Sequence, residues 1–336
     1  MKLATLKDGS RDGQLVVVSR DLGTAHYATG IAHRLQQVLD DWGFLSPQLQ
    51  DLYDSLNAGR ARHAFPFDPR QCMAPLPRAY QCLQGTAYPQ HAELEYRARG
   101  VESPAALRRE PLLLQVAGDA CWGPCDDILA PDAAMGLDFG AGLAVITGDV
   151  PRGSAPAQAL DGVRLVMLAN TVALRNLESL ERERGQGLLQ SRPGTAFSPV
   201  AVTPDELGAA WEQGRVHLTL QSTWNGRKVG MCEAGNDMAF HFGQLIAHAG
   251  TTRHLRAGSI VCSGPVSNPP VQDAKGRADW PRGYGCIAEK RWIETLQDGQ
   301  PVTGYLQDGD TVRIEMKGKD GNSLFGAIEQ SVVLER

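Results

Sequence analysis

The stretch from Gly136 to Pro204 constrains the fold of this chain more than any other segment. It opens with LDFGAGLAVITGDVP and closes with SRPGTAFSPVAVTP, two runs in which apolar residues are bounded by turn residues. Such runs predict strands of a mostly antiparallel sheet. Between them, residues 159–185 place apolar residues at helical spacing and end at Gly185, which predicts a long helix.

The N-terminal part of the chain predicts a small α+β domain. Residues 1–20 contain two alternating apolar runs around an Asp-Gly turn, which is the pattern of a β-hairpin. Residues 30–59 have helical spacing, and we expect Gly43 and Pro47 to separate two helices there.

A proline-rich, extended segment then marks a domain boundary near residue 76, and residues 77–336 form a second, larger domain. Pro89 begins a helix, because proline is tolerated in a first helical turn. Asn225 and Gly226 form the Asn-Gly turn of a hairpin. A further helix over 240–258 is followed by expected strands at 258–264, 285–296 and 310–334. The expected fold class is therefore α+β, mainly β.

Charge and cysteine usage exclude some kinds of partner. The formal net charge is -5, whereas nucleic-acid binding needs a clustered positive face. No apolar run has signal-peptide or membrane-spanning length, so we expect a cytoplasmic protein with no membrane partner. Among seven widely spread cysteines, Cys121 and Cys125 form the only close pair. We interpret them as reduced thiols, with a zinc knuckle or a disulfide as the alternative.

The order of motifs in the larger domain is more specific. LDFxAxxAVxxGDVP is followed by LxNxxxLRNL, SRPxTAFSPVAVTP, a WNGRKV hairpin, FxxxQLIAH, GSIVCSG and GDTVRIEMKGKDG. Together these motifs resemble the fumarylacetoacetate hydrolase family over residues 77–336, and longer members carry a small N-terminal domain. The resemblance implies a rolled, mixed β-sheet with packed helices and a homodimer. It also implies a hydrolase- or lyase-like enzyme that acts on carbon–carbon bonds of a small carboxylate or dicarbonyl substrate.

Metal ligands of that family are replaced in this chain. The family holds Mg²⁺ or Ca²⁺ with carboxylates, because hard cations need oxygen ligands. By resemblance, the matching positions are Gly140, Gly142 and Thr171, and none carries a carboxylate. The sequence therefore predicts no cofactor and makes the family's Mg²⁺ or Ca²⁺ doubtful. A shifted alignment, with Asp138 as the nearest other acid, is the competing interpretation.

The resemblance also indicates catalytic residues. His91 and Glu93 match a histidine–carboxylate pair that activates water as a general base. The alternative for His91 is a surface or capping residue, and the family often places the glutamate three positions after the histidine. Arg175 matches an arginine that stabilises an enolate. Its alternative role is a helix-surface ion pair with Glu178, three residues later.

Other positions match substrate-binding residues of the family. Arg192 stands where the family has lysine, and its guanidinium has paired donors for a carboxylate. Ser263 and Gly264 resemble a turn that presents backbone donors to the substrate. Glu289 resembles an acid near the reacting water. The complete expected substrate-binding set is Tyr88, Asn170, Glu178, Arg192, Thr195, Ser263, Gly264 and Glu289.

Three functions follow from these residues. The sequence favours an enzyme that acts on a small β-dicarbonyl or 2-oxo acid without a metal, by carbon–carbon hydrolysis, decarboxylation or tautomerisation through an enolate. An ordinary metal-dependent carbon–carbon hydrolase, with ligands that the sequence does not reveal, is the first alternative. The second alternative is a non-catalytic relative that binds a ligand.

Overall fold

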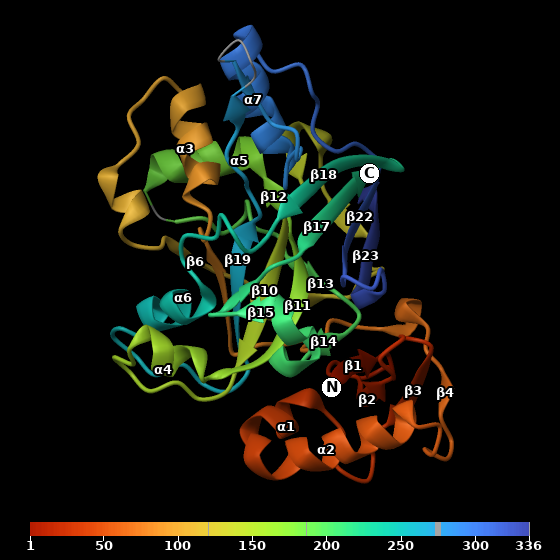
Figure 1. The fold of residues 1–336 in the computed structure, drawn as a ribbon. Helices are drawn as coiled ribbons and strands as arrows, with labels where there is room; N and C mark the ends of the chain where they lie inside the picture. Colours follow the sequence, from red (N-terminus) through yellow and green to blue (C-terminus); the bar gives the residue numbers. More distant parts are fainter. Residues whose placement is uncertain (120, 186, 273–276, 336) are drawn as a thin grey trace.

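The computed structural model describes residues 1–119, 121–185, 187–272 and 277–335. The fold is α+β, with mixed β-sheets and helices packed around them, as the sequence predicted (Figure 1). Within the described residues, every helix is too short or too polar to cross a membrane.

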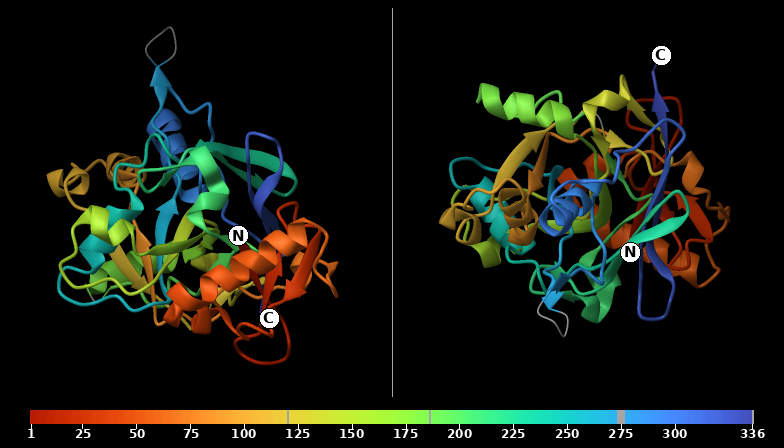
Figure 2. Two further views of the ribbon diagram at one scale, coloured as in Figure 1. Left: turned by 60° about the horizontal axis from the view of Figure 1, so that its bottom comes forward. Right: turned by 90° about the horizontal axis from the view of Figure 1, so that it is seen from above.

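The N-terminal part combines strands with two helices. The first two strands pair antiparallel, which confirms the predicted hairpin. The elements of this part are β1 (Lys2–Leu6), β2 (Gln14–Val18), β3 (Thr24–Tyr27), α1 (Leu35–Asp40), α2 (Trp42–Asn57) and β4 (Phe65–Pro66). They lie together at one side of the molecule, as the left view of Figure 2 shows.

The break between these two helices differs from the prediction. It falls at Asp41, and both Gly43 and Pro47 lie inside α2. Pro47 is the sixth residue of α2 and cannot donate a backbone hydrogen bond to Gly43, yet the helix continues past it to Asn57.

The larger sheet runs from the N-terminal part into the centre of the molecule. Its strand order is β4-β3-β2-β1-β14-β11-β10-β19-β5-β6, with β13 and β7 paired beside β11. The pair β19 and β5 is parallel, and so is the pair β13 and β7. The further strands of this sheet are β5 (Gln81–Gly85), β6 (Leu113–Val116), β7 (Cys121–Trp122), β10 (Ala141–Thr147), β11 (Val163–Thr171), β13 (Thr195–Phe197), β14 (Ala201–Val202) and β19 (Ser259–Pro265).

Both faces of the central strands are buried. Leu143 and Val145 of β10 belong to one apolar cluster, whereas Ala144 and Ile146 belong to a second one. The second cluster also contains apolar residues of α1 and α2, such as Val38 and Leu49. The N-terminal helices therefore cover one face of the central sheet.

The predicted long helix over 159–185 is only partly present. Residues 163–171 form strand β11, which pairs with β10 over its whole length. A strand buried on both faces is almost continuously apolar, and periodicity alone does not distinguish it from a buried helix. After β12 (Ala173–Leu174) the chain enters α5 (Arg175–Arg184), which ends at Gly185 as predicted.

A smaller sheet has the strand order β18-β17-β22-β23-β8. The turn between β17 and β18 contains Asn225 and Gly226 with φ values of 49° and 72°, which confirms the Asn-Gly hairpin. Its strands are β8 (Ile128–Ala130), β17 (Thr219–Trp224), β18 (Arg227–Glu233), β22 (Thr311–Lys317) and β23 (Ser323–Leu334). Short pairs elsewhere are β9 (Leu137–Asp138) with β12, β15 (Trp211–Glu212) with β16 (Arg215–Val216), and β20 (Val271–Gln272) with β21 (Ala278–Asp279).

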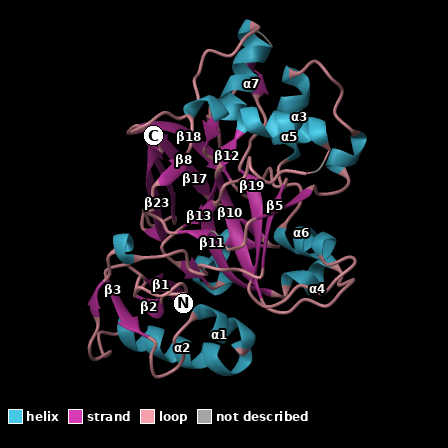
Figure 3. Ribbon diagram, turned by 180° about the vertical axis from the view of Figure 1, so that it is seen from behind, coloured by secondary structure: helices cyan, strands magenta, loops and turns pink. Residues whose placement is uncertain are grey.

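Three helices gather at one end of the sheets, where Figure 3 shows them from behind. They are α3 (Pro89–Ala98), which begins at the predicted proline, α5, and α7 (Ile287–Asp298). Most of the predicted strand over 285–296 is thus the helix α7, in which Glu289 and Ile293, four positions apart, are both buried, as are Ile287 and Glu294, seven positions apart. Helix α6 (Phe242–Ala249) packs against α4 (Pro156–Leu160) elsewhere.

Candidate active site

A cavity of about 400 Å³ lies among α3, α5, β5, β6 and β19. Several predicted site residues line it, although they come from segments far apart in the sequence: Tyr88, His91, Arg175, Glu178, Arg192, Ser263 and Gly264. Glu93, Asn170, Thr195 and Glu289 are not among its lining residues. The fold therefore brings together a histidine, buried arginines and a glycine turn around one space.

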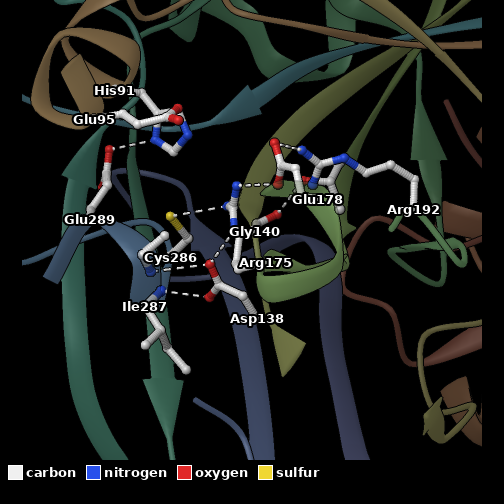
Figure 4. Close-up of polar contacts among 12 residues, drawn as sticks. His91, Glu95, Asp138, Gly140, Arg175, Glu178, Arg192, Cys286, Ile287 and Glu289 are labelled. Carbon is white, nitrogen blue, oxygen red and sulfur yellow. Dashed lines mark hydrogen bonds and ion pairs between the residues drawn. The ribbon is translucent and has the colours of Figure 1, made fainter. Parts of the chain in front are cut away.

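His91 has a buried carboxylate partner. It lies in the first turn of α3, and its Nδ1 is 2.9 Å from Oε1 of Glu289 on α7. Glu289 is 2% exposed, and its other oxygen accepts a hydrogen bond from the backbone N–H of Gly285. The edge of the His91 ring also packs against Trp292. These contacts fix the orientation of the imidazole beside the cavity (Figure 4).

Glu93 does not take the orienting role that the sequence predicted. Its carboxylate is paired with Arg108, which is largely exposed. Residues two positions apart on a helix point in different directions, so Glu93 cannot share the face of His91. Glu289, expected near the reacting water, occupies the place next to the imidazole instead.

Arg175 is the centre of a buried polar cluster. Its Nε donates to Asp138 at 2.9 Å, its Nη1 to Glu178 at 3.1 Å, and its Nη2 lies 3.7 Å from Sγ of Cys286. Although burial acts in the opposite direction, the charges of Asp138 and Glu178 hold the pKa of Arg175 above its ordinary value. The expected ion pair with Glu178 is therefore present, and it lies at the cavity wall.

Asp138 connects this cluster to α7. Its Oδ1 accepts a hydrogen bond from the backbone N–H of Ile287 at 2.7 Å, and its Oδ2 accepts one from Ala288 at 3.1 Å. Its side chain is fully buried, and this burial raises its pKa against the opposing effect of Arg175. Asp138 thus satisfies the first N–H groups of a helix that has no other side-chain cap.

Glu178 and Arg192 also line the cavity, where they form an ion pair with each other. Glu178 accepts from Arg182 at 2.6 Å and lies 3.0 Å from Nη2 of Arg192. Burial would raise its pKa, but Arg175, Arg192 and Arg182 outweigh burial and lower the pKa of Glu178 to about 2. Arg192 is 8% exposed, and its Nε and Nη1 have no hydrogen-bond partner among the described residues. Burial lowers the pKa of Arg192 to about 10, which leaves it charged near neutral pH.

A loop held by Glu181 carries Arg192 into the cavity. Glu181 accepts hydrogen bonds from the backbone N–H groups of Leu189, Gln190 and Ser191, and from the Ser191 hydroxyl. Although burial would raise it, these donors lower the pKa of Glu181 to about 2. The sequence did not indicate this residue, because its partners lie eight to ten positions further along the chain.

We expect Glu181→Gln to reduce stability at pH 7 and to remove part of the acid sensitivity. The lowered pKa of Glu181 means that its ionised form stabilises the fold above pH 4.5, and that this contribution is lost as the pH falls toward 2. Urea unfolding at pH 7 and pH 3 should show the difference between wild type and variant shrinking at the lower pH. The exposed Glu183, on the same helix, provides the matched control Glu183→Gln; a difference independent of pH would contradict this account.

The positions that the resemblance predicted for metal ligands, Gly140, Gly142 and Thr171, contain no carboxylate, and the two glycines have little space around them. A Cβ atom added at Gly140 would lie 2.4 Å from Oγ1 of Thr171, and one at Gly142 would lie 2.3 Å from the carbonyl oxygen of Gly264. Both distances are far below van der Waals contact. A metal held at this place by acidic side chains does not fit this backbone.

Asn170 and Thr195 are structural in this arrangement. Oδ1 of Asn170 accepts from the backbone N–H of Gly140, and its Nδ2 donates to Gln330, so both ends of its amide bind protein groups. Thr195 is buried on β13 opposite Thr171. Neither side chain lines the cavity.

Tyr88, Ser263 and Gly264 line the cavity, but the hydroxyl groups of Tyr88 and Ser263 donate hydrogen bonds to other protein groups. The Tyr88 hydroxyl donates to the carbonyl of Ala234, and the Ser263 hydroxyl donates to the carbonyl of Gly264. Gly264 has a φ of 76° and approaches the backbone of Gly85 so closely that a side chain would not fit. This turn therefore presents backbone to the cavity.

A different group of side chains could hold a metal ion. His91, Cys286 and Glu289 have ligand atoms that all lie within 4.8 Å of one another. Nitrogen, sulfur and oxygen donors together suit a borderline cation such as Zn²⁺ better than Mg²⁺ or Ca²⁺. Burial raises the pKa of the Cys286 thiol, while the neighbouring Arg175 acts in the opposite direction. Cys286 was not indicated by the sequence pattern.

Comparison with known proteins gives two family matches. Residues 1–78 match the model described as fumarylacetoacetase N-terminal domain 2, and residues 82–333 match that of the fumarylacetoacetate (FAA) hydrolase C-terminal region. Among curated proteins, 2,4-didehydro-3-deoxy-L-rhamnonate hydrolase of Sphingomonas sp. (strain SKA58) is 27% identical over 187 residues, which are 54% of this chain. The match spans 61% of that relative, less than two thirds of its length.

Solved structures share the fold. The fumarylacetoacetate hydrolase of Exiguobacterium antarcticum has a TM-score of 0.63 at 20% identity, with both chains fully covered. Maleylpyruvate hydrolase of Sphingobium sp. SYK-6, solved in complex with manganese(II) and pyruvate, has a TM-score of 0.63 at 17% identity, again over both whole chains.

The expectation of a site without a cofactor is wrong. A protein of the same fold binds manganese(II) together with pyruvate, and His91, Cys286 and Glu289 form a group that could hold a metal. The predicted carboxylate positions lie on or next to β10 and β11, whereas these donors come from α3 and from the start of α7. Residues 198 positions apart, such as His91 and Glu289, leave no local pattern in the sequence.

Proposed function

This chain belongs to the fumarylacetoacetate hydrolase family, and from that premise we propose that it is an enzyme acting on a small 2-oxo or β-dicarbonyl acid through an enolate. The observation that carries this proposal is the pair of His91 and Glu289 beside a cavity that also contains the buried guanidinium of Arg192. A base and a fixed positive charge are the two groups that enolate chemistry needs.

His91 acts as the base in this proposal. When Nδ1–H donates to Glu289, Nε2 is left as the acceptor that takes a proton from water. In hydrolysis, the hydroxide oxygen bonds to the acyl carbon and the carbon–carbon bond to the neighbouring methylene breaks. The electron pair of that bond forms the enolate of a 2-oxo acid, which then takes the proton from His91. The products are a carboxylic acid and a 2-oxo acid.

The arginines contribute positive charge in different ways. Each guanidinium nitrogen of Arg175 already has a partner, Asp138, Glu178 or Cys286, so Arg175 acts on the enolate mainly through its charge. Arg192 has uncommitted donors and binds the substrate carboxylate directly. The hydrolase names of the relatives favour carbon–carbon hydrolysis, and decarboxylation or tautomerisation would use the same enolate.

A metal-bound form of the site is the alternative within the proposal. His91, Cys286 and Glu289 would hold the cation, and the manganese complex of maleylpyruvate hydrolase makes a metal relevant to this fold. In that form His91 is a ligand, so its imidazole is not the base that Glu289 orients. When bound, such a cation supplies positive charge that polarises a carbonyl oxygen. The homodimer, the cytoplasmic location and the division of the chain near residue 76 are further parts of the proposal, and they rest on the family resemblance.

We expect metal removal to abolish turnover of 2,4-dioxopentanoate if the metal-bound form is the active one, and to leave turnover unchanged if unliganded His91 is the base. Turnover is measured by the loss of the ultraviolet absorbance of this substrate. Metal analysis of the purified protein should find a divalent ion, a strong chelator should remove it, and Mn²⁺ or Zn²⁺ should restore activity. Cys286→Ser should lower the metal content, whereas Cys125→Ser, at a partly buried cysteine outside the group, should not. Full metal content in Cys286→Ser would exclude this ligand set. Tight binding of a 2-oxo acid with no turnover under any condition would show a non-catalytic relative.

A further inference from the structure

Arg192 provides a single position for an anion in the cavity. The other arginines of the lining, Arg175 and Arg182, are bound to Asp138 and Glu178, whereas Nε and Nη1 of Arg192 have no described partner. Two unpartnered guanidinium nitrogens on a side chain that is 8% exposed are costly unless a ligand accepts from their N–H groups. The cavity therefore has a receptor for one carboxylate.

A second carboxylate would meet an unfavourable environment. Glu95 and Glu178 also line the cavity and would repel another negative charge. Glu178 remains ionised, because its pKa is held at about 2. Since Arg175 and Arg182 are already paired with carboxylates, a dicarboxylate would have to bury its second charge without a cation that is free to bind it, which is expensive.

The wall next to β6 is apolar. Leu112, Leu113 and Leu114 line it in succession, and Leu188 and the ring of Tyr96 complete it. A cavity near 400 Å³ falls within the range of roughly 300 to 1,000 Å³ that is typical of sites for drug-sized ligands. It has more room than a substrate as small as pyruvate needs.

We infer that the substrate is a monocarboxylic 2-oxo or β-dicarbonyl acid with an apolar tail, either an alkyl chain or an aryl group. Its carboxylate binds Arg192, and its tail lies along the wall of Leu112, Leu113, Leu114 and Leu188. This inference rests on the proposed function and adds the class of substrate to it.

The experiment is a calorimetric titration of the full-length protein with 2-oxo acids of increasing length. Pyruvate, 2-oxobutanoate, 2-oxopentanoate and 2-oxohexanoate are the alkyl probes, with phenylpyruvate as the aryl probe and 2-oxoglutarate as the dicarboxylate. Each added methylene group should lower Kd about threefold to fourfold, because the burial of one methylene is worth that factor. 2-Oxoglutarate should bind more weakly than 2-oxopentanoate, which has the same chain length.

Two variants test the contact of the carboxylate and the contact of the apolar tail separately. Arg192→Gln should raise Kd for every 2-oxo acid roughly tenfold to a hundredfold, since one charge-assisted contact is lost. Leu112→Ser, at a side chain that is 52% exposed, should flatten the dependence on chain length and leave pyruvate binding unchanged. The control is Leu129→Ser, which removes a similarly exposed leucine on β8, away from the cavity. Thermal unfolding checks that each variant is folded.

The inference fails if Kd does not depend on chain length, if 2-oxoglutarate binds as tightly as 2-oxopentanoate, or if folded Arg192→Gln binds like the wild type. These outcomes are measured by binding, so they do not depend on turnover. Tail-dependent binding without any reaction would contradict the proposed function and leave the inference intact.

Discussion

Asp138→Ala should lower the free energy of unfolding by about 3 to 5 kcal/mol, the cost of removing one member of a buried ion pair. The substitution leaves the guanidinium of Arg175 without one of its carboxylates and leaves the N–H groups of Ile287 and Ala288 without an acceptor. Because these groups belong to α5 and α7, the loss acts on both helices at the cavity. Urea unfolding at pH 7 gives the free energy directly.

Two further variants make this prediction specific. Asp138→Asn keeps the size of the side chain and one acceptor, so it should cost less than alanine but more than an exposed substitution. Asp298→Ala, at the exposed end of α7, should change stability by no more than about 0.5 kcal/mol. Asp138→Ala within that same range would show that the buried cluster does not stabilise the fold.

His91→Ala should reduce turnover of a 2-oxo acid substrate by about a hundredfold to ten-thousandfold, the usual contribution of a positioned acid–base group. The substitution removes the group that Glu289 orients and leaves Arg192 in place for the substrate carboxylate. Steady-state kinetics should therefore show the loss mainly in kcat, with KM little changed.

The exposed His248 on α6 provides a histidine control, since His248→Ala should retain the wild-type rate. Glu289→Gln keeps the shape of the orienting side chain without its charge, and we expect it to slow turnover less than His91→Ala does. A folded His91→Ala protein with a rate near that of the wild type would rule out the imidazole as the base.

Local sequence signals predicted the elements that depend on local interactions. The Asn225–Gly226 hairpin, the helix that begins at Pro89 and the helix end at Gly185 are all set by the conformational preferences of one or two residues. The sequence did not predict β11, because its almost continuous apolar run is compatible with either a strand or a helix. Its pairing with β10, β13 and β14 decides between a strand and a helix.

In the candidate site too, the sequence predicted a contact between neighbouring residues and missed the contacts between distant ones. The ion pair of Arg175 with Glu178 was visible in the sequence because the two residues are three positions apart on one helix. The contact between His91 and Glu289 joins residues 198 positions apart, and the sequence named Glu93 as the partner only because it is nearby. Asp138, Cys286 and Glu181 likewise gain their roles from tertiary contacts.

The pairing of β1 with β14 has a consequence for the chain as a whole. Without residues 1–76, β14 would have unpaired N–H and C=O groups, and the apolar face now covered by α1 and α2 would be open to water. An open strand border next to an uncovered apolar surface is a template for aggregation. We therefore expect the larger part of the chain to depend on residues 1–76 to remain in solution, which couples the two parts more tightly than a flexible linker would.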